Sequence, residues 1–213
     1  MDKKILLNVC CAPDATHSIE VLNNSGFTVI THFYNPNIHP KEEYIKRLQD
    51  MEKLAKILQI ENIENVPYDV EEWHTLCDKY KDEKEGGKRC VICYEMRLRK
   101  TAQKAKELKI DVFATTLTIS PHKNTKLINV IGKKIATEFN IEYLETDFKK
   151  KDGFKKSIEF SKKYCLYRQN YCGCIYSLPI FWDLSIASNA TPMILLSLIT
   201  GPPLFPGFTA ASI

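Results

Sequence analysis

The sequence of 213 residues predicts an α/β fold, with a largely parallel sheet and flanking helices. Short apolar runs alternate along the chain with longer segments whose apolar residues recur at helical spacing. The composition, with 44% hydrophobic and 26% charged residues, is that of a globular protein. This length is enough for one domain with a sizeable core. Ligands of such sheets bind beyond the carboxyl ends of the strands.

Short apolar runs, each closed by turn residues, predict the strands. The expected strands are residues 4–9, 27–34, 62–67, 111–116 and 141–144. Helical spacing of apolar side chains predicts the segments between them. The expected helices are 15–24, a long helix containing Ile45, Leu48, Met51, Leu54 and Leu58, then 90–108 and 123–139. The charged stretch 71–85 has no assignment, and Gly86-Gly87 interrupts it before Cys90.

Polar and sulfur-bearing residues follow three of the predicted strands. Cys10, Asn35 and the stretch 116–122 each come just after a strand. Because carboxyl ends of parallel strands meet at one edge of the sheet, we expect these residues to lie together.

The net charge is only mildly positive, with 30 Lys+Arg against 26 Asp+Glu and a formal charge of +4. This balance permits a nucleic-acid partner but does not by itself indicate one. One run of lysines is either a binding patch or a solvated helix face. It consists of Lys149, Lys150, Lys151, Lys155, Lys156, Lys162 and Lys163.

The end of the chain differs in composition from the rest. Residues 184–213 include no charged residue, Pro202, Pro203 and Pro206 interrupt them, and the apolar run 193–199 is too short to span a bilayer. We therefore expect a metal-binding domain over 1–183 and a tail over 184–213 of unknown role, non-native or poorly ordered. No membrane association is expected.

Eight cysteines are many for this length. The apolar run 5–9 is too short for the core of a secretory signal, so a cytoplasmic location is expected. In that reducing compartment disulfides are disfavoured, and clustered thiols indicate metal ligands or redox groups.

The pair Cys90-x-x-Cys93 is expected to open a helix and to direct both sulfurs to one centre. The positive helix end and Arg89 are expected to lower the pKa values of these two thiols. The spacing alone fits zinc, an iron–sulfur cluster or dithiol chemistry. In Cys172-Gly173-Cys174 the glycine permits a tight turn, in which the thiols either converge on a metal or are merely small residues.

The adjacent side chains of Cys10 and Cys11 are expected to diverge and thus to serve two neighbouring centres. Asp14 is either a further ligand or the N-cap of a helix beginning at Ala15. Cys77 is expected to be incidental and Cys165 to be a core residue. Six thiols exceed the four of a tetrahedral zinc site, which indicates two metals or a cluster with a companion ion.

Five stretches in order along the chain form a more specific pattern than any single cysteine pair. They are Asn8-Val9-Cys10-Cys11-Ala12-Pro13-Asp14, Phe33-Tyr34-Asn35-Pro36-Asn37-Ile38, Arg89-Cys90-x-x-Cys93-Tyr94-x-x-Arg97-Leu98, Thr115-Thr116-Leu117-x-x-Ser120-Pro121-x-Lys123 and Tyr167-Arg168-Gln169-x-Tyr171-Cys172-Gly173-Cys174-x-Tyr176-Ser177. With these stretches the chain resembles the cobalamin-independent epoxyqueuosine reductases, the QueH family. The resemblance covers nearly all of the chain except the tail.

The resemblance implies an oxidoreductase that reduces epoxyqueuosine to queuosine at the wobble position of tRNA. It also implies a nucleotide α-hydrolase-like layout, a [4Fe-4S] cluster with an adjacent metal ion, expected to be iron, and an external electron donor. The implied ligands are Cys10, Cys11, Asp14, Cys90, Cys93, Cys172 and Cys174. Of these, we assign Cys11 and Asp14 to the lone ion and Cys90 and Cys93 to the cluster, and leave Cys10, Cys172 and Cys174 open between the two centres.

Further roles are hypotheses about the mechanism. We expect Asp14 and Cys11 to act in catalysis, and His122, Lys123, Tyr34 or Tyr167 to supply a proton. The residues expected to bind substrate are Asn35, Arg97, Ser120 and Arg168, with Lys123 as another candidate for the tRNA phosphates. For the two arginines, pairing with acidic residues on the surface is the alternative. The stretch after the first strand contains no glycine to cradle a phosphate, so ATP use is not expected.

Two other functions fit parts of the sequence. A non-catalytic zinc protein that binds tRNA would use the cysteines as structural ligands, but it leaves the excess of thiols unexplained. A cysteine-rich electron carrier would need neither the stretch 120–123 nor the stretch 167–177.

Overall fold

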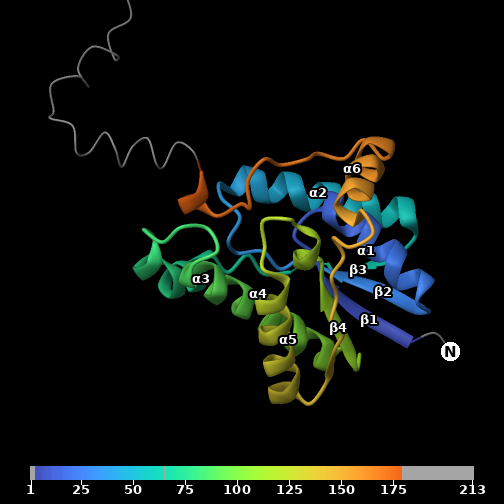
Figure 1. The fold of residues 1–213 in the computed structure, drawn as a ribbon, viewed down its shortest axis with the longest axis horizontal. Coiled ribbons are helices and arrows are strands. Elements are labelled where there is room, and N and C mark those ends of the chain that lie inside the picture. Colours follow the sequence, from blue (N-terminus) through green and yellow to red (C-terminus); the bar gives the residue numbers. More distant parts are fainter. Residues whose placement is uncertain (1–2, 65, 179–213) are drawn as a thin grey trace, which may run out of the picture. The chain divides into compact units, whose positions relative to one another are not determined.

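The structure is a computed structural model, and it describes residues 3–64 and 66–178. Its centre is one sheet of five parallel strands in the order β3-β2-β1-β4-β5 (Figure 1). The strands are β1 (Lys3–Asn8), β2 (Phe27–His32), β3 (Glu61–Asn62), β4 (Val112–Thr115) and β5 (Glu142–Tyr143). The predicted α/β fold with a parallel sheet is confirmed.

Alternation of side chains along β1 divides the interior into two cores. Ile5, Leu7 and Val9 belong to one core, whereas Leu6 belongs to the other. Successive side chains of a strand point to opposite faces, and both faces of this central strand are covered. That double burial explains why the three consecutive residues Ile5, Leu6 and Leu7 are all apolar.

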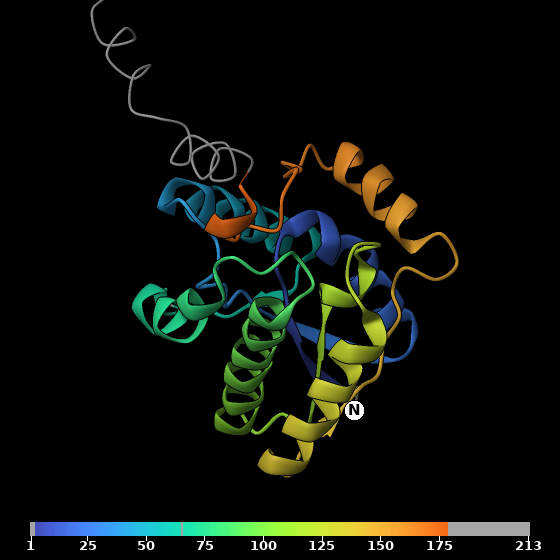
Figure 2. The ribbon, with the colours of Figure 1, turned by 60° about the vertical axis from the view of Figure 1, so that its left-hand side comes forward.

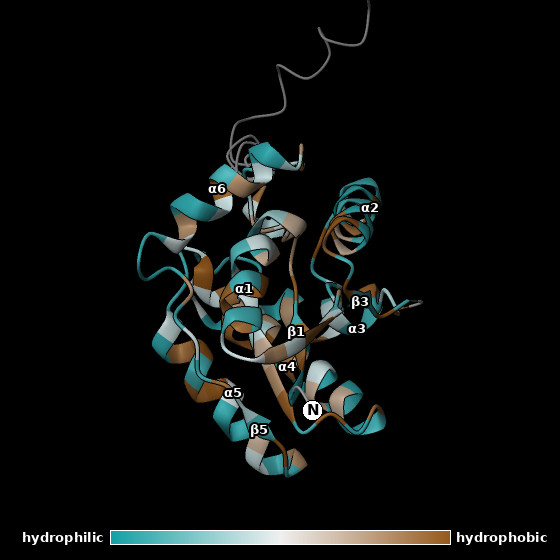
Figure 3. Ribbon diagram, turned by 90° about the vertical axis from the view of Figure 1, so that its right-hand side faces the viewer, coloured by the Kyte–Doolittle hydropathy of each residue, from teal (hydrophilic) through white to brown (hydrophobic). Residues whose placement is uncertain are grey.

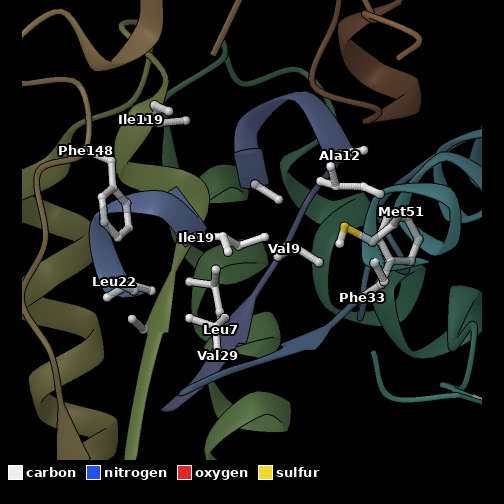
Figure 4. Close-up of a cluster of buried hydrophobic side chains, with 14 of the residues drawn as sticks. Leu7, Val9, Ala12, Ile19, Leu22, Val29, Phe33, Met51, Ile119 and Phe148 are labelled. Carbon is white, nitrogen blue, oxygen red and sulfur yellow. The ribbon is translucent and has the colours of Figure 1, made fainter. Parts of the chain in front are cut away.

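Helices cover both faces of the sheet. In the first core, shown in Figure 4, α1 (Ala12–Asn24) contributes Ile19 and α2 (Lys41–Leu58) contributes Met51. In the second core, α4 (Lys88–Glu107) and α5 (Thr125–Phe139) pack against the other face. Hydrophobic and hydrophilic residues alternate along α5, as a half-buried helix requires (Figure 3).

Some element boundaries differ from the prediction. The third strand has two paired residues instead of the expected 62–67, because it is a short edge strand and Pro67 has no N–H to donate. The unassigned stretch 71–85 forms α3 (Val70–Cys77) and a 3₁₀ turn, η1 (Asp78–Tyr80). A further helix, α6 (Gly153–Lys163), contains four of the lysines singled out above and packs on α1.

The remaining 3₁₀ turns are η2 (Thr116–Ile119), directly after β4, and η3 (Ile175–Ser177). In the part of the chain that the structure describes, no helix is long and apolar enough to cross a membrane. The expected boundary at 183/184 and the tail 184–213 lie outside the described residues.

Candidate metal centre

A cavity of about 480 Å³ opens at the carboxyl ends of the strands. The segments that follow β1 and β4 meet there, since the backbone N–H of Cys10 donates to Thr116 Oγ1 over 3.4 Å. Asn35, after β2, donates from Nδ2 to the carbonyl oxygen of Val9 over 2.9 Å. The expected meeting of these segments at one edge is confirmed. The cysteines that line the cavity are Cys10, Cys90, Cys93, Cys172 and Cys174.

Cys10, Cys11 and Asp14 form a compact buried group. The sulfurs of Cys10 and Cys11 are 3.9 Å apart, Cys10 Sγ donates to Asp14 Oδ2 over 3.3 Å, and all three ligand atoms lie within 4.8 Å of one another. The expectation that the adjacent thiols diverge is therefore wrong. The chain is extended at Cys11, with φ −168° and ψ 157°, and turns there from β1 into α1.

The same geometry decides between the two roles considered for Asp14. The N-cap residue of α1 is Cys11, so the helix begins at Ala12, and Asp14 lies inside its first turn. The N-cap alternative for Asp14 is wrong. Its carboxylate stays with the two thiols, where it is 8% exposed.

Cys90 lies in the first turn of α4 and Cys93 in the second, three residues further along the helix, so the predicted helix at this pair is confirmed. Cys90 Sγ also accepts a hydrogen bond of 3.2 Å from the backbone N–H of Gly86. Each of the two thiols interacts electrostatically with Cys172, which brings the third cysteine pair to the same part of the cavity.

The turn between Cys172 and Cys174 requires a glycine. Gly173 has φ +103°, and a Cβ at this position would lie 2.8 Å from Cγ1 of Ile38. The two cysteines are hydrogen-bonded to each other, and together with Cys90 and Cys93 they form a second, wider group of thiols. The structure thus divides the sulfurs into a compact group with a carboxylate and a wider group of four.

Helix α2 holds the turn through Arg47, a residue that the sequence analysis missed. Its guanidinium donates to the carbonyl oxygens of Tyr171 and Cys172, both over 3.3 Å, and to Glu43 Oε1 over 2.7 Å. The guanidinium also lies 5.1 Å from the ring centroid of Tyr171. Arg47 is 2% exposed. No periodicity or motif distinguishes it from other charged residues of α2.

Burial determines the thiol acidities in α4. It raises the pKa of Cys90, and it raises the pKa of Cys93 to about 11, against the lowering effects of Arg89 and Arg97 respectively. The expected lowering by the helix end and Arg89 is wrong. Arg89 instead donates to carbonyl oxygens of residues 80, 81 and 83.

The other thiols divide into acidic and weakly acidic partners. The hydrogen bond with Cys11, helped by the nearby charges of Lys123 and Arg97, holds the pKa of Cys10 well below its usual range. A hydrogen bond with Cys174 lowers the pKa of Cys172 to about 6. Each group therefore contains one thiol that ionises readily, which favours metal binding because thiolates are the ligands.

Asp14 and Lys123 share this environment. Burial and the charge of Cys10 raise the pKa of Asp14 to about 7. Burial lowers the pKa of Lys123, but the negative charges of Cys10, Asp14 and Cys172 more than offset it, and the net shift is upward. Lys123 therefore stays an ammonium ion beside the ligands.

The other expected site residues lie at different depths. His122, Lys123, Ser120, Arg97 and Arg168 line the cavity. Asn35 lies behind it, where its Oδ1 accepts a hydrogen bond of 2.6 Å from Arg97 Nη2. The hydroxyls of Tyr34 and Tyr167 donate to Asp69 and Glu43, and neither tyrosine lines the cavity.

Three residues were given too little weight or the wrong role. Gln169 Nε2 lies 2.9 Å from Cys11 Sγ and can donate to it. Cys77, expected to be incidental, is buried and interacts electrostatically with Cys93. Cys165, expected in the core, is exposed, because the chain turns there with φ +52°.

Two solved structures show the same fold. One is a protein described as a predicted subunit of tRNA methyltransferase from Methanocaldococcus jannaschii, with TM-score 0.51 and 15% identity over 75% of this chain and 74% of that chain. The other is the tRNA thiolase NcsA from Methanococcus maripaludis, with TM-score 0.52 and 14% identity over 88% of this chain and 65% of that chain. The nucleotide α-hydrolase-like layout is confirmed.

Sequence comparisons place the chain more closely. The profile of the family described as epoxyqueuosine reductase QueH matches residues 5–179. The QueH protein of Streptococcus pyogenes is 42% identical over 181 residues, 81% of this chain and 69% of that protein. The QueH protein of Thermotoga maritima is 39% identical over 177 residues, 82% of this chain and 90% of that protein. The chain therefore belongs to the QueH family of epoxyqueuosine reductases, a family of oxidoreductases.

Proposed function

We propose that this chain reduces the epoxide of epoxyqueuosine in tRNA and holds two metal centres side by side for this reaction. The reaction class follows from the family. The observation that supports the site is the division of six thiols and Asp14 into two groups at one cavity. A structural zinc protein would need only four ligands, and it would not need a cavity of this size beside them.

The donor sets fit the two centres. Cys10, Cys11 and Asp14 are close enough to bind one ion, and their two sulfurs and one oxygen suit iron. Cys90, Cys93 and Cys172, with Cys174 beside them, line a wider space that suits a [4Fe-4S] cluster. When bound, the cluster would supply electrons and the ion a Lewis acid for the epoxide oxygen.

The proton supply is assigned to the cavity wall. Two electrons and two protons convert an epoxide into an alkene and water. Lys123 is a protonated group next to Cys10 and Asp14, and His122 lies at the exposed side of the same loop. We assign the proton that goes to the epoxide oxygen to Lys123 Nζ, with His122 connecting the site to solvent. Tyr34 and Tyr167 are weaker candidates, since neither reaches the cavity.

Substrate contacts are assigned by the same criterion. Arg97 and Arg168 line the cavity and can donate to the modified base or its phosphates, and Ser120 Oγ is within the same wall. Asn35 has its amide occupied by Val9 and its oxygen by Arg97. We therefore assign Asn35 to the positioning of Arg97. An external electron donor completes the reaction.

The test is the replacement Asp14→Ala after anaerobic purification and cluster reconstitution. Wild-type protein should contain roughly four sulfides and four or five irons per chain. The variant should keep the sulfide and lose about one iron, and turnover of tRNA carrying epoxyqueuosine should fall at least about 100-fold. Glu20→Ala, which removes an exposed carboxylate from the same helix, should leave the iron content, the sulfide content and the turnover unchanged.

Full activity of the Asp14→Ala variant would overturn the role given to that carboxylate. Wild-type protein that binds only zinc after reconstitution would overturn the redox centre as a whole. It would leave a zinc protein that binds tRNA as the better account.

A further inference from the structure

Charge is distributed unevenly around the mouth of the cavity. Residues 147–163, which include α6, contain seven lysines and three acids, a net charge of +4. The whole chain also has a formal charge of +4, so all other residues together are neutral. The entire excess of positive charge is therefore in 17 consecutive residues.

The lysines of α6 face solvent. Its buried residues are Gly153, Ser157 and Ser161, which leaves Lys155, Lys156, Lys162 and Lys163 on the opposite, exposed side. Among the described residues, no carboxylate forms an ion pair with Lys155, Lys156 or Lys162. These three ammonium groups are therefore not neutralised within residues 3–64 and 66–178.

The helix also reaches the cavity. Phe154, in its first turn, lines the cavity, and so does Arg168, which follows the helix. Arg168 is fixed against the inner side of α6, where Nη1 lies 3.3 Å from Ser161 Oγ and the guanidinium lies 5.5 Å from the ring centroid of Phe154. The exposed lysines thus continue outward from the wall of the proposed active site.

The other side of the mouth has the opposite charge. Residues 69–85 contain seven acids and three lysines, a net charge of −4, and this segment contributes Trp73 and Glu85 to the cavity wall. In Figures 1 and 2, α3 of this segment and α6 lie on opposite sides of the molecule. A polyanion at the cavity is attracted to one side and repelled from the other.

We propose that the exposed face of α6, formed by Lys155, Lys156, Lys162 and Lys163, binds the phosphate backbone of the tRNA whose modified base enters the cavity. This inference rests on the proposed function, which supplies the polyanion. Beyond that function, the inference names the surface that binds the tRNA backbone and the side of the cavity from which the tRNA approaches. Lysine side chains bind phosphates as flexible point charges, so this contact positions the strand without reading its sequence.

The test compares two triple variants with equal charge change. Lys155→Glu, Lys156→Glu and Lys162→Glu reverse the face of α6. The control, Lys4→Glu, Lys56→Glu and Lys106→Glu, reverses three exposed lysines on β1 and near the ends of α2 and α4. All three control positions lie at the amino ends of the strands, away from the cavity. Lys4 is near the start of β1, and Lys56 and Lys106 are near the C-terminal ends of α2 and α4, which run back toward the amino ends of the strands.

Binding is measured by fluorescence anisotropy of labelled tRNA carrying epoxyqueuosine, with anaerobic iron-loaded protein, at several salt concentrations. The α6 variant should raise Kd at least about tenfold at low salt. The slope of log Kd against log salt concentration should fall by about two, because three phosphate contacts are lost. The control should change Kd by less than about threefold. The neutral variant with glutamine at the three α6 positions should show a smaller loss in the same direction.

Iron content and kinetics separate this proposal from the proposed function. The α6 variant should keep the wild-type iron content and the kcat at saturating tRNA, while its KM rises. An α6 variant that binds as tightly as the control would overturn the surface and leave the reductase activity standing. Wild-type protein that binds tRNA through α6 without turnover would overturn the reductase instead.

Discussion

Replacing Arg47 with methionine removes the main contacts between α2 and the turn that contains Cys172 and Cys174. The guanidinium donates to two carbonyl oxygens of that segment and to the carboxylate of Glu43, and it is 2% exposed. Methionine fills a similar volume without any donor. The replacement therefore isolates the polar contacts from packing.

The magnitude follows from burial. Breaking a buried ion pair by removing one partner costs about 3–5 kcal/mol, because the other charge stays buried. The side chain of Glu43 is 11% exposed, and among the described residues it keeps only the hydroxyl of Tyr167 as a side-chain donor. Each hydrogen bond from a charged donor to a carbonyl contributes about 1.5 kcal/mol at the long distance of 3.3 Å. Since one side chain makes all these contacts, the terms do not add, and we expect a loss of about 4 kcal/mol.

Urea unfolding of the metal-free protein measures the loss of stability, and iron and sulfide analysis after reconstitution measures the second effect. With the turn released, Arg47→Met should retain less than half of the wild-type iron and sulfide at a temperature where it is fully folded. Arg99→Met is the matched control, because Arg99 pairs with Glu95 and Glu138 on the surface. Such exposed pairs contribute at most about 1 kcal/mol, and the metal content should not change.

Arg47→Lys distinguishes charge from geometry. A lysine keeps the positive charge near Glu43 but cannot donate simultaneously to that carboxylate and to two carbonyl oxygens. It should recover part of the stability and less of the metal content. If Arg47→Met folds, loses under about 1 kcal/mol and binds iron normally, Arg47 does not position the ligands.

Two further predictions concern the support of the site. Burial lowers the pKa of His32 to about 4, below its ordinary value of 6.5, so the folded state favours the neutral ring. The neutral His32 therefore stabilises the fold fully above pH 6.5, and this contribution is lost as the pH falls from 6.5 to 4. The total loss is about 3 kcal/mol. The urea unfolding free energy of wild type should therefore fall more steeply over this range than that of His32→Gln, and equal slopes would contradict the assignment. A Cβ on Gly153 would lie 1.7 Å from the carbonyl oxygen of Phe148, so Gly153→Ala should displace the start of α6. We expect the free energy of unfolding to fall by about 3 kcal/mol. An unchanged urea midpoint would show that the helix can shift without cost.

The sheet and most helices could be predicted because their periodicity is local. The stretch from Ile5 to Val9 is apolar except for the buried Asn8, and a short strand covered on both faces explains this pattern. The two-residue β3 could not be bounded in this way, because an edge strand ends where pairing with β2 ends. Pairing is a property of two segments.

The candidate ligands could be selected from residue type and spacing, but their grouping could not. Whether Cys10 and Cys11 converge depends on the extended backbone at Cys11, which is set by the turn from β1 into α1. The thiol acidities depend on burial, which outweighs Arg89 at Cys90. Arg47 was invisible in the sequence because its partners are carbonyl oxygens about 125 residues away.

Four positively charged side chains line the cavity, and they differ in how their charge is compensated. Arg47, Arg89, Arg97 and Lys123 all line it, and the three arginines are at most 3% exposed. A buried cation is stable only beside negative charge or strong acceptors. Arg47 and Arg89 satisfy this condition within the protein, through Glu43 and through backbone carbonyls. Arg97 donates only from Nη2, to the neutral amide of Asn35, and its Nε has no hydrogen-bond partner among the described residues. Arg97 and Lys123 both lie near the readily ionised thiol of Cys10. Under the proposed function, these two cations would gain their compensating charge from thiolate ligands and bound substrate, and we therefore propose them for the reacting end of the site and the other two as supports.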